Sequence, residues 1–96
     1  MAKPKQIQLV GHIDVPQNRL DEITAALPEH IRLTRLEPGC VSFNVTPDPD
    51  YAGRFNVAEV FANRADFDQH QSRTKASEWA RITQGIARSY TITECH

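Results

Sequence analysis

A glutamate and a histidine occupy positions where the surrounding sequence predicts buried apolar residues. Glu59 lies in the run RFNVAEVF, residues 54–61, in which apolar side chains alternate with more polar ones. His70 follows on an expected helix, three residues after Phe67 and therefore on the same face. A carboxyl group that is desolvated on an apolar face has a raised pKa, and a nearby imidazole can take a proton from a substrate hydroxyl. Glu59 and His70 are therefore the candidate catalytic residues.

The same pair also has a structural interpretation. A buried carboxylate is unfavourable unless it is paired, so Glu59 could be tied to Arg54, to His70 or to a backbone amide. His70 could equally be a core histidine that bonds Glu59 and takes part in no reaction. The residues alone leave both interpretations open.

Other polar side chains are candidates for binding a substrate. Arg54 is expected at the mouth of a hairpin, where it could clamp an anionic or phenolate oxygen. Its favoured role is to brace Asp48 or Asp50 across the turn. Asn44 and His12 are weaker candidates, on strand positions that are expected to face a partner sheet.

Three aromatic residues, Phe43, Phe61 and Trp79, could wall an apolar pocket that suits a flat ring. Packing in the core is the alternative for each of them. The two remaining histidines, His30 and His96, are expected at the surface.

The elements that must position these residues follow from changes in hydrophobic period along the chain. Strand-like alternation occurs at residues 5–14, 40–46, 54–62 and 87–94. Helical spacing occurs at about residues 16–37, begins again at residue 63, and occurs once more after residue 72 as far as residue 86. The order is β-α-β-β-α-β, the ferredoxin-like arrangement of a four-stranded antiparallel sheet with both helices on one face. We therefore expect an α+β fold in a single domain, residues 1–96.

Local signals predict where the helices begin and bend. Asp14 is a possible cap ahead of Pro16, and Asn63 can cap the second helix. Pro28 removes one backbone hydrogen bond, so we expect it to kink or split the first helix near Leu27.

A sheet with both helices on one face leaves its other face open. With 96 residues the chain has nothing left to cover that face. A second copy of the sheet is the simplest cover, so we expect a homodimer.

Composition and charge argue against several classes of function. The formal net charge is −1, and no basic cluster or interleaved row of aromatics suggests a nucleic-acid groove. The polar N-terminus and the lack of a long apolar run argue against a signal peptide and a membrane span, so the expected location is the cytoplasm. Cys40 and Cys95 lie far apart and are expected to be reduced thiols. The sequence shows no metal-ligand cluster or phosphate-binding loop, so we expect neither a metal nor a cofactor.

Two stretches in order along the chain, EPGCVSFNV and GRFNVAEVFANRADFDQH, resemble the antibiotic biosynthesis monooxygenase (ABM) domains of the dimeric α/β-barrel superfamily. In motif terms the resemblance runs from about Glu37 to His70. It implies a dimeric α/β barrel and favours a functional role for His70, because the family's pattern has a histidine there. Two departures stand out: Phe61 replaces the usual strand tryptophan, and TKAS at residues 74–77 replaces a stretch that often holds a second histidine. A haem-degrading role is therefore disfavoured.

Members of this family differ widely in reaction, so the resemblance indicates the fold better than the chemistry. The expected function is a cofactor-independent monooxygenase-like enzyme of a small aromatic, quinol- or phenol-type substrate. His70 or Glu59 would remove a phenolic proton, and the anion would react directly with dioxygen in a water-poor pocket. The alternatives are a non-catalytic small-ligand-binding or stress-associated barrel protein, and an isomerase that uses the same pair to move protons. An enzyme needs an enclosed cavity that both side chains reach.

Overall fold

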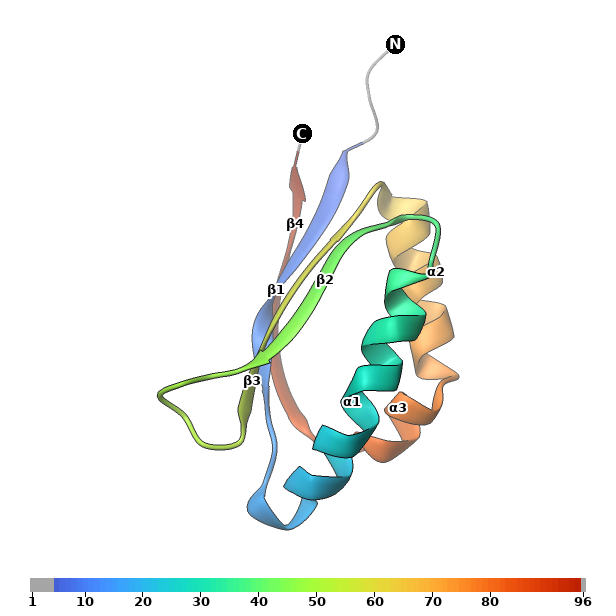
Figure 1. Ribbon diagram of the computed structural model, residues 1–96. Helices are drawn as coiled ribbons and strands as arrows, with labels where there is room; N and C mark the ends of the chain where they lie inside the picture. Colours follow the sequence, from blue (N-terminus) through green and yellow to red (C-terminus); the bar gives the residue numbers. More distant parts are fainter. Residues whose placement is uncertain (1–4, 96) are drawn as a thin grey trace.

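The computed structural model describes residues 5–95 and shows one antiparallel sheet whose helices all lie on one side (Figure 1). The strands are β1 (Gln6–Asp14), β2 (Cys40–Pro47), β3 (Arg54–Phe61) and β4 (Ala87–Cys95), in the spatial order β2-β3-β1-β4. The helices are the 3-10 turn η1 (Gln17–Arg19), α1 (Leu20–Arg35), α2 (Arg64–Lys75) and α3 (Glu78–Ile82). The predicted ferredoxin-like β-α-β-β-α-β fold is confirmed. None of the described helices is long and apolar enough to cross a membrane.

Side-chain caps begin the two helices that follow β3. Asn63 Oδ1 accepts a hydrogen bond from the backbone amide of Asp66 at 2.9 Å, which confirms the expected cap. Ser77 Oγ accepts one from the amide of Ala80 at 3.3 Å and donates one to the carbonyl of Thr74 at 2.6 Å. Because this serine bonds the end of one helix and the start of the next, the two helical segments expected here divide at Ser77 and not at residue 72. The helix α2 ends just before Ser77, and α3 is a separate, short helix.

The start of the first helix differs from the expectation that Asp14 caps it. Asp14 lies at the end of β1, where its carboxylate accepts a hydrogen bond from Arg54 Nε at 2.8 Å. Pro16 instead stands at the N-terminus of η1, which leads directly into α1. The fixed φ angle of proline suits such a start.

The first helix does not split at Pro28, because α1 continues through it from Leu20 to Arg35. Pro28 is exposed, so the carbonyl of Thr24, which would have bonded the amide of residue 28, can bond water instead. Ile23 is buried before the proline and Thr34 is buried after it. Packing on both sides therefore holds the helix together.

The core lies between the inner face of the sheet and the helices. Alternate residues of three strands fill it, as the two-residue period predicts: Ile7, Leu9, Ile13, Phe43, Val45, Phe55, Val57 and Phe61. Ile23 and Leu27 of α1 and Phe67 of α2 pack against them. Glu59 belongs to the same inward row and is only 5 % exposed.

One residue of β2 departs from this alternation. Simple alternation places Val41 on the apolar face with Phe43, but Val41 is exposed. A β-bulge between Cys40 and Ser42 inserts an extra residue opposite β3 and turns Val41 outward.

The strand β4 forms one edge of the sheet and pairs only with β1. Its residues are exposed along almost its whole length, and Ile92 is 48 % exposed although it pairs with the buried Leu9. Gly11 of β1 pairs with Tyr90, and a side chain on Gly11 would collide with the backbone of Ser89. The two strands can therefore approach closely only because residue 11 is a glycine.

Candidate active site

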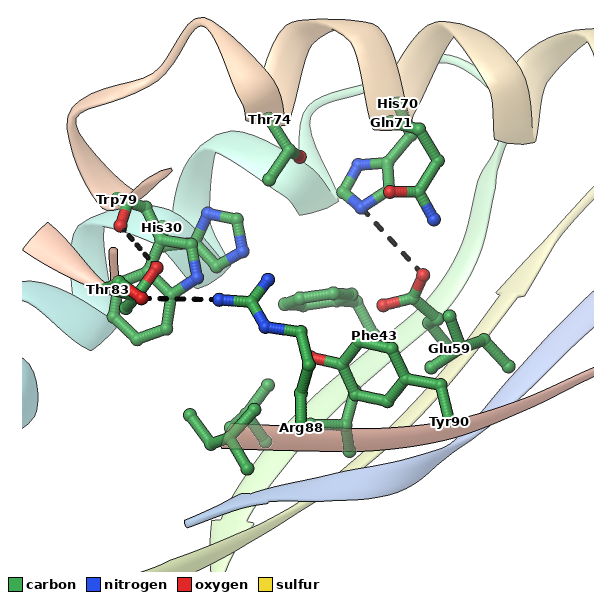
Figure 2. A pocket seen from close by; sticks show the side chains of 14 residues that line it. His30, Phe43, Glu59, His70, Gln71, Thr74, Trp79, Thr83, Arg88 and Tyr90 are labelled. Carbon is green, nitrogen blue, oxygen red and sulfur yellow. Dashed lines mark hydrogen bonds and ion pairs between the residues drawn. The ribbon is translucent and has the colours of Figure 1, made fainter. Parts of the chain in front are cut away.

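A small cavity of about 70 Å³ lies between the inner face of the sheet and the helices (Figure 2). Phe43 and Trp79 form part of its apolar wall. The polar and charged side chains that line it are His30 of α1, Glu59 of β3, His70, Gln71 and Thr74 of α2, Thr83 after α3, and Arg88 and Tyr90 of β4. The cavity therefore offers several groups that can exchange protons with a ligand.

Glu59 and His70 meet at one side of this cavity. Glu59 projects from β3 and His70 from α2, and Glu59 Oε1 lies 3.8 Å from His70 Nε2 (Figure 2). Both residues are buried, with exposed fractions of 5 % and 3 %. The separation is too long for a direct hydrogen bond. A single oxygen atom of a ligand or of water can bridge the two groups.

The other ring nitrogen of His70 is held by Glu37, which follows α1. Nδ1 lies 2.8 Å from Glu37 Oε2, and Arg73 Nε donates to the same oxygen at 3.1 Å. Because a carboxylate oxygen accepts this bond, Nδ1 carries the proton, and the lone pair of Nε2 faces Glu59 and the cavity. Nothing in the sequence pairs Glu37 with His70, since only tertiary packing brings the two together.

Burial makes Glu59 difficult to ionise. Desolvation, with the negative charge of Glu37 adding to it, raises the pKa of Glu59 from 4.5 to about 7. No lysine or arginine among residues 5–95 forms an ion pair with Glu59. Near neutral pH this carboxyl group can therefore either take or give a proton.

Two phenylalanine rings hold the His70 ring in place. Phe61 stacks on it with ring centroids 4.6 Å apart, and Phe43 meets it edge-on at 5.9 Å. Phe43 lines the cavity, as does Trp79, whereas Phe61 is fully buried and does not reach it. Phe61 therefore positions the imidazole instead of contacting a ligand.

His30 was expected at the surface but is buried, with 6 % exposure. Its ring stacks on Trp79 with centroids 4.8 Å apart, and both rings line the cavity. Burial lowers the pKa of His30 to about 4, with the charges of Arg73 and His70 adding to the effect, so its ring is neutral at physiological pH. The sequence did hold a signal, because His30 follows Leu27 by three residues on the buried face of α1.

All three polar residues that were candidates for binding a substrate lie away from the cavity. Arg54 points to the outer face of the sheet, where it pairs with Asp14 at 2.8 Å and not with an aspartate of the turn. Asn44 is exposed on the same face and accepts a hydrogen bond from Arg35 Nη2 at 3.3 Å. His12, also on this face, lies 3.7 Å from Asp14. Arg54 and Asn44 are each next in sequence to an inward-facing residue, so their side chains point to the outer face of the sheet and do not reach the cavity.

Within residues 5–95, no three histidine, cysteine, aspartate or glutamate side chains gather closely enough to hold a metal ion. His96 lies outside the described residues. Cys40 and Cys95 are both free thiols.

The family model with the description "Antibiotic biosynthesis monooxygenase" (ABM) matches residues 7–82, from the second residue of β1 to the end of α3. This chain belongs to the ABM family. The match contains Glu37, Glu59 and His70, so this buried cluster lies in the family segment of this ABM protein.

Solved structures share the fold of this ABM protein at low sequence identity. A protein from Deinococcus radiodurans that is named after the same family has a TM-score of 0.83 at 17 % identity, covering 94 % of this chain and 92 % of its own. A conserved protein of unknown function from Bacteroides thetaiotaomicron has a TM-score of 0.82 at 16 % identity, covering 94 % of this chain and 97 % of its own. The uncharacterized Synechocystis protein sll1783 is 34 % identical over 64 residues, which make up 67 % of this chain. The matched segment spans only 44 % of that relative's length.

The last strand of this ABM protein lies beyond the family match, which ends at residue 82. Arg88 and Tyr90 of β4 nevertheless line the cavity. Burial raises the pKa of the Tyr90 phenol, which favours its protonated form. The alternation of β4 was the only sequence signal for these two residues, and it does not show which of its faces meets a cavity.

Proposed function

We propose that this ABM protein is a cofactor-independent monooxygenase of small aromatic, quinol- or phenol-type substrates. One observation carries the proposal: His70 Nε2 and Glu59 Oε1 stand 3.8 Å apart beside the cavity, while Glu37 holds His70 Nδ1. This arrangement supplies a base with an oriented lone pair and a second carboxyl group that titrates near neutral pH.

In the proposed reaction a substrate hydroxyl lies between the two groups and gives its proton to His70 Nε2. The carboxylate of Glu37 stabilises the imidazolium that forms, as the acidic member of a catalytic triad does. The electron-rich phenolate then reduces dioxygen directly in a pocket with little water. One oxygen atom enters the ring and the other leaves as water. The substrate supplies all the electrons, so that a quinol becomes a hydroxyquinone.

The size of the cavity sets a condition on this reaction. An apolar cavity of about 150 Å³ holds a benzene ring, whereas this one measures about 70 Å³. An aromatic ring must therefore displace part of the cavity wall. The β4 side chains Arg88 and Tyr90 can move most easily, because they are exposed and are not packed in the core. A second hollow of about 230 Å³ lies between α1 and α3, and the stacked His30 and Trp79 rings line both spaces. Movement of these side chains gives a substrate the room it needs.

Oxygen consumption tests the proposal directly. Protein treated with a chelator is expected to consume dioxygen with at least one member of a panel of quinols and phenols. One molecule of dioxygen should be consumed for each molecule of substrate. With isotopically labelled dioxygen, one labelled atom should enter the product and the other should appear in water. Hydrogen peroxide as the main product would indicate autoxidation of the substrate and would contradict the proposal.

A non-catalytic role has structural support of its own. Glu37 bonds both His70 and Arg73 of α2, and Arg73 Nη2 donates to Thr34 Oγ1 of α1 at 3.1 Å. This network ties the end of α1 to α2 whether or not a reaction occurs. If the network has only this purpose, the protein binds a ligand in the cavity and consumes no quinol faster than buffer does.

We also propose that the chain forms a homodimer through the uncovered face of the sheet. Val10, Ala58 and Val60 form an apolar strip across β1 and β3 on this face, and Val10 is 40 % exposed. A second copy of the same face is the simplest cover for such a strip.

Sedimentation at micromolar concentration is expected to give about twice the chain mass of 10.9 kDa. Val10→Arg places a charge in the middle of the proposed interface and should yield a monomer. Leu36→Arg changes an exposed leucine just after α1, away from this face, and should leave the dimer intact. A wild-type chain that sediments as a monomer would rule the proposal out.

A further inference from the structure

Arg88 is a cation that lines the cavity. It comes from the face of β4 that is turned toward the helices, and its guanidinium extends toward Thr83 (Figure 2). Its hydrogen bonds are long ones to backbone carbonyls, from Nη2 to Thr83 at 3.3 Å and from Nε to Ile86 at 3.5 Å. No carboxylate in the described part of the chain forms an ion pair with it. A guanidinium carries five donors in a rigid fork, so most of those on Arg88 are available to a ligand.

Two further polar atoms of the cavity walls lack partners. Among residues 5–95, His30 Nδ1 and Thr74 Oγ1 are buried and make no hydrogen bond. Both side chains line the same cavity as Arg88, and buried polar groups in folded proteins are normally satisfied. Unpaired groups on α1, α2 and β4 around one cavity suit a ligand that carries a strongly polar group.

Arg88 lies across the cavity from Glu59 and His70, whereas Thr74 follows His70 by about one turn of α2. Figure 2 shows Arg88 and His30 on one side, and Glu59 with His70 on the other. An anionic group is attracted by the guanidinium and repelled by the Glu59 carboxylate. A ligand with an acidic group at one end and a hydroxyl at the other therefore has one favourable orientation, with the hydroxyl next to His70.

We propose that Arg88 binds an anionic oxygen of the substrate, so that the preferred substrates are aromatic acids that carry a ring hydroxyl. The planar fork of Arg88 matches the two oxygens of a carboxylate. The neutral imidazole of His30 and the hydroxyl of Thr74 line the same cavity and can add hydrogen bonds to the ligand. The turnover of such substrates rests on the proposed monooxygenase activity, whereas their binding does not.

Calorimetric titration without oxygen measures binding independently of turnover. The two probes are hydroquinone and gentisate, which is a hydroquinone with a carboxylate on the ring. Gentisate is expected to bind about 10–100-fold more tightly, which is the contribution of one hydrogen-bonded contact to a charged group. Equal affinities in the wild-type protein would overturn the inference.

Variants of Arg88 assign the difference to this side chain. Arg88→Met keeps an unbranched apolar stem but removes the charge, and should lower the affinity for gentisate to that for hydroquinone. Arg88→Lys keeps the charge without the fork and should recover part of the affinity. Arg32→Met removes the same charge from an exposed position on α1, where Arg32 pairs with Glu29, and should leave both affinities unchanged.

The outcomes separate this inference from the proposed function. Unchanged gentisate affinity in folded Arg88→Met overturns the inference even if quinols are oxidised. Gentisate binding that depends on Arg88, together with no oxygen uptake, supports the inference and counts against the monooxygenase. If Arg88→Met does not fold, the inference is tested by comparing the affinities for gentisate and hydroquinone in the wild type and in Arg88→Lys.

Discussion

Replacing His70 with alanine is expected to lower the turnover of the aromatic substrate by about 10²–10⁴-fold, the usual contribution of general acid–base catalysis. The variant loses the nitrogen whose lone pair is oriented by Glu37 and faces Glu59 and the cavity. Glu59→Gln should lower turnover by a similar factor, because the amide keeps the shape of the side chain but cannot exchange the proton. Oxygen uptake at saturating substrate measures both effects.

His12→Ala is the matched control, because it removes an imidazole from the outer face of β1 and leaves the cavity untouched. Its turnover should equal that of the wild type. Melting temperatures recorded on the same samples separate chemistry from structure. A catalytic pair predicts lost turnover in a folded protein, and a structural pair predicts a lower melting temperature with ligand affinity retained. A folded His70→Ala variant with wild-type turnover would refute the catalytic assignment.

Glu59→Gln is also expected to change how stability depends on pH. The pKa of Glu59 is about 7 in the folded protein, compared with an ordinary value of 4.5. Because the folded state holds this proton more tightly, the contribution of Glu59 to stability is fully present below pH 4.5 and is lost as the pH rises through about 7. The separation of the two pKa values corresponds to about 3 kcal/mol in the free energy of unfolding.

His30 has the opposite dependence. Its pKa falls from 6.5 to about 4, so its contribution is present above pH 6.5 and is lost as the pH falls toward 4. In the wild type the two contributions nearly cancel between about pH 4.5 and 6.5. Relative to the wild type, the free energy of unfolding of Glu59→Gln should therefore rise by about 3 kcal/mol between about pH 4.5 and 7. That of His30→Phe should fall by about 3 kcal/mol between about pH 4 and 6.5.

Urea unfolding at a series of pH values and one protein concentration measures these differences. Comparison of each variant with the wild type removes the contribution of the other ionisable groups. A difference for Glu59→Gln that stays constant with pH would show that the folded protein does not desolvate this carboxyl group.

The inward position of Glu59 could be predicted because a strand turns alternate side chains to opposite faces, and its neighbours on one face are apolar. The roles of Glu37 and Arg88 could not be predicted in this way. Glu37 lies in a loop, and its distance from His70 depends on how α1 packs relative to α2. Arg88 lies in β4, where nearly all residues are exposed. Alternation therefore does not predict on which face of the sheet the Arg88 side chain lies.

The surface position expected for His30 and a split of the first helix at Pro28 were both wrong. Each was predicted from the type of the residue and not from its place in the helical period. A histidine is often at the surface, but the spacing from Leu27 to His30 and Thr34 puts all three on the buried face of α1. A proline often ends a helix, but α1 continues through Pro28, which lies on the exposed side, where water can bond the carbonyl that lost its partner. In both cases the packing of the helix against the sheet outweighs the local preference.

The edge strand β4 carries residues that are proposed to bind the ligand but that do not belong to the core. Arg88 and Tyr90 line the cavity, yet they belong to an exposed strand that pairs only with β1. Glu59 and His70 belong to the buried core. Substitutions at surface positions of this kind usually change stability little, whereas those in a core usually destabilise. If the proposed roles hold, mutations in this one peripheral strand can change which ligand binds while the buried pair Glu59 and His70 is kept, which is a route for duplicated genes to acquire new substrates.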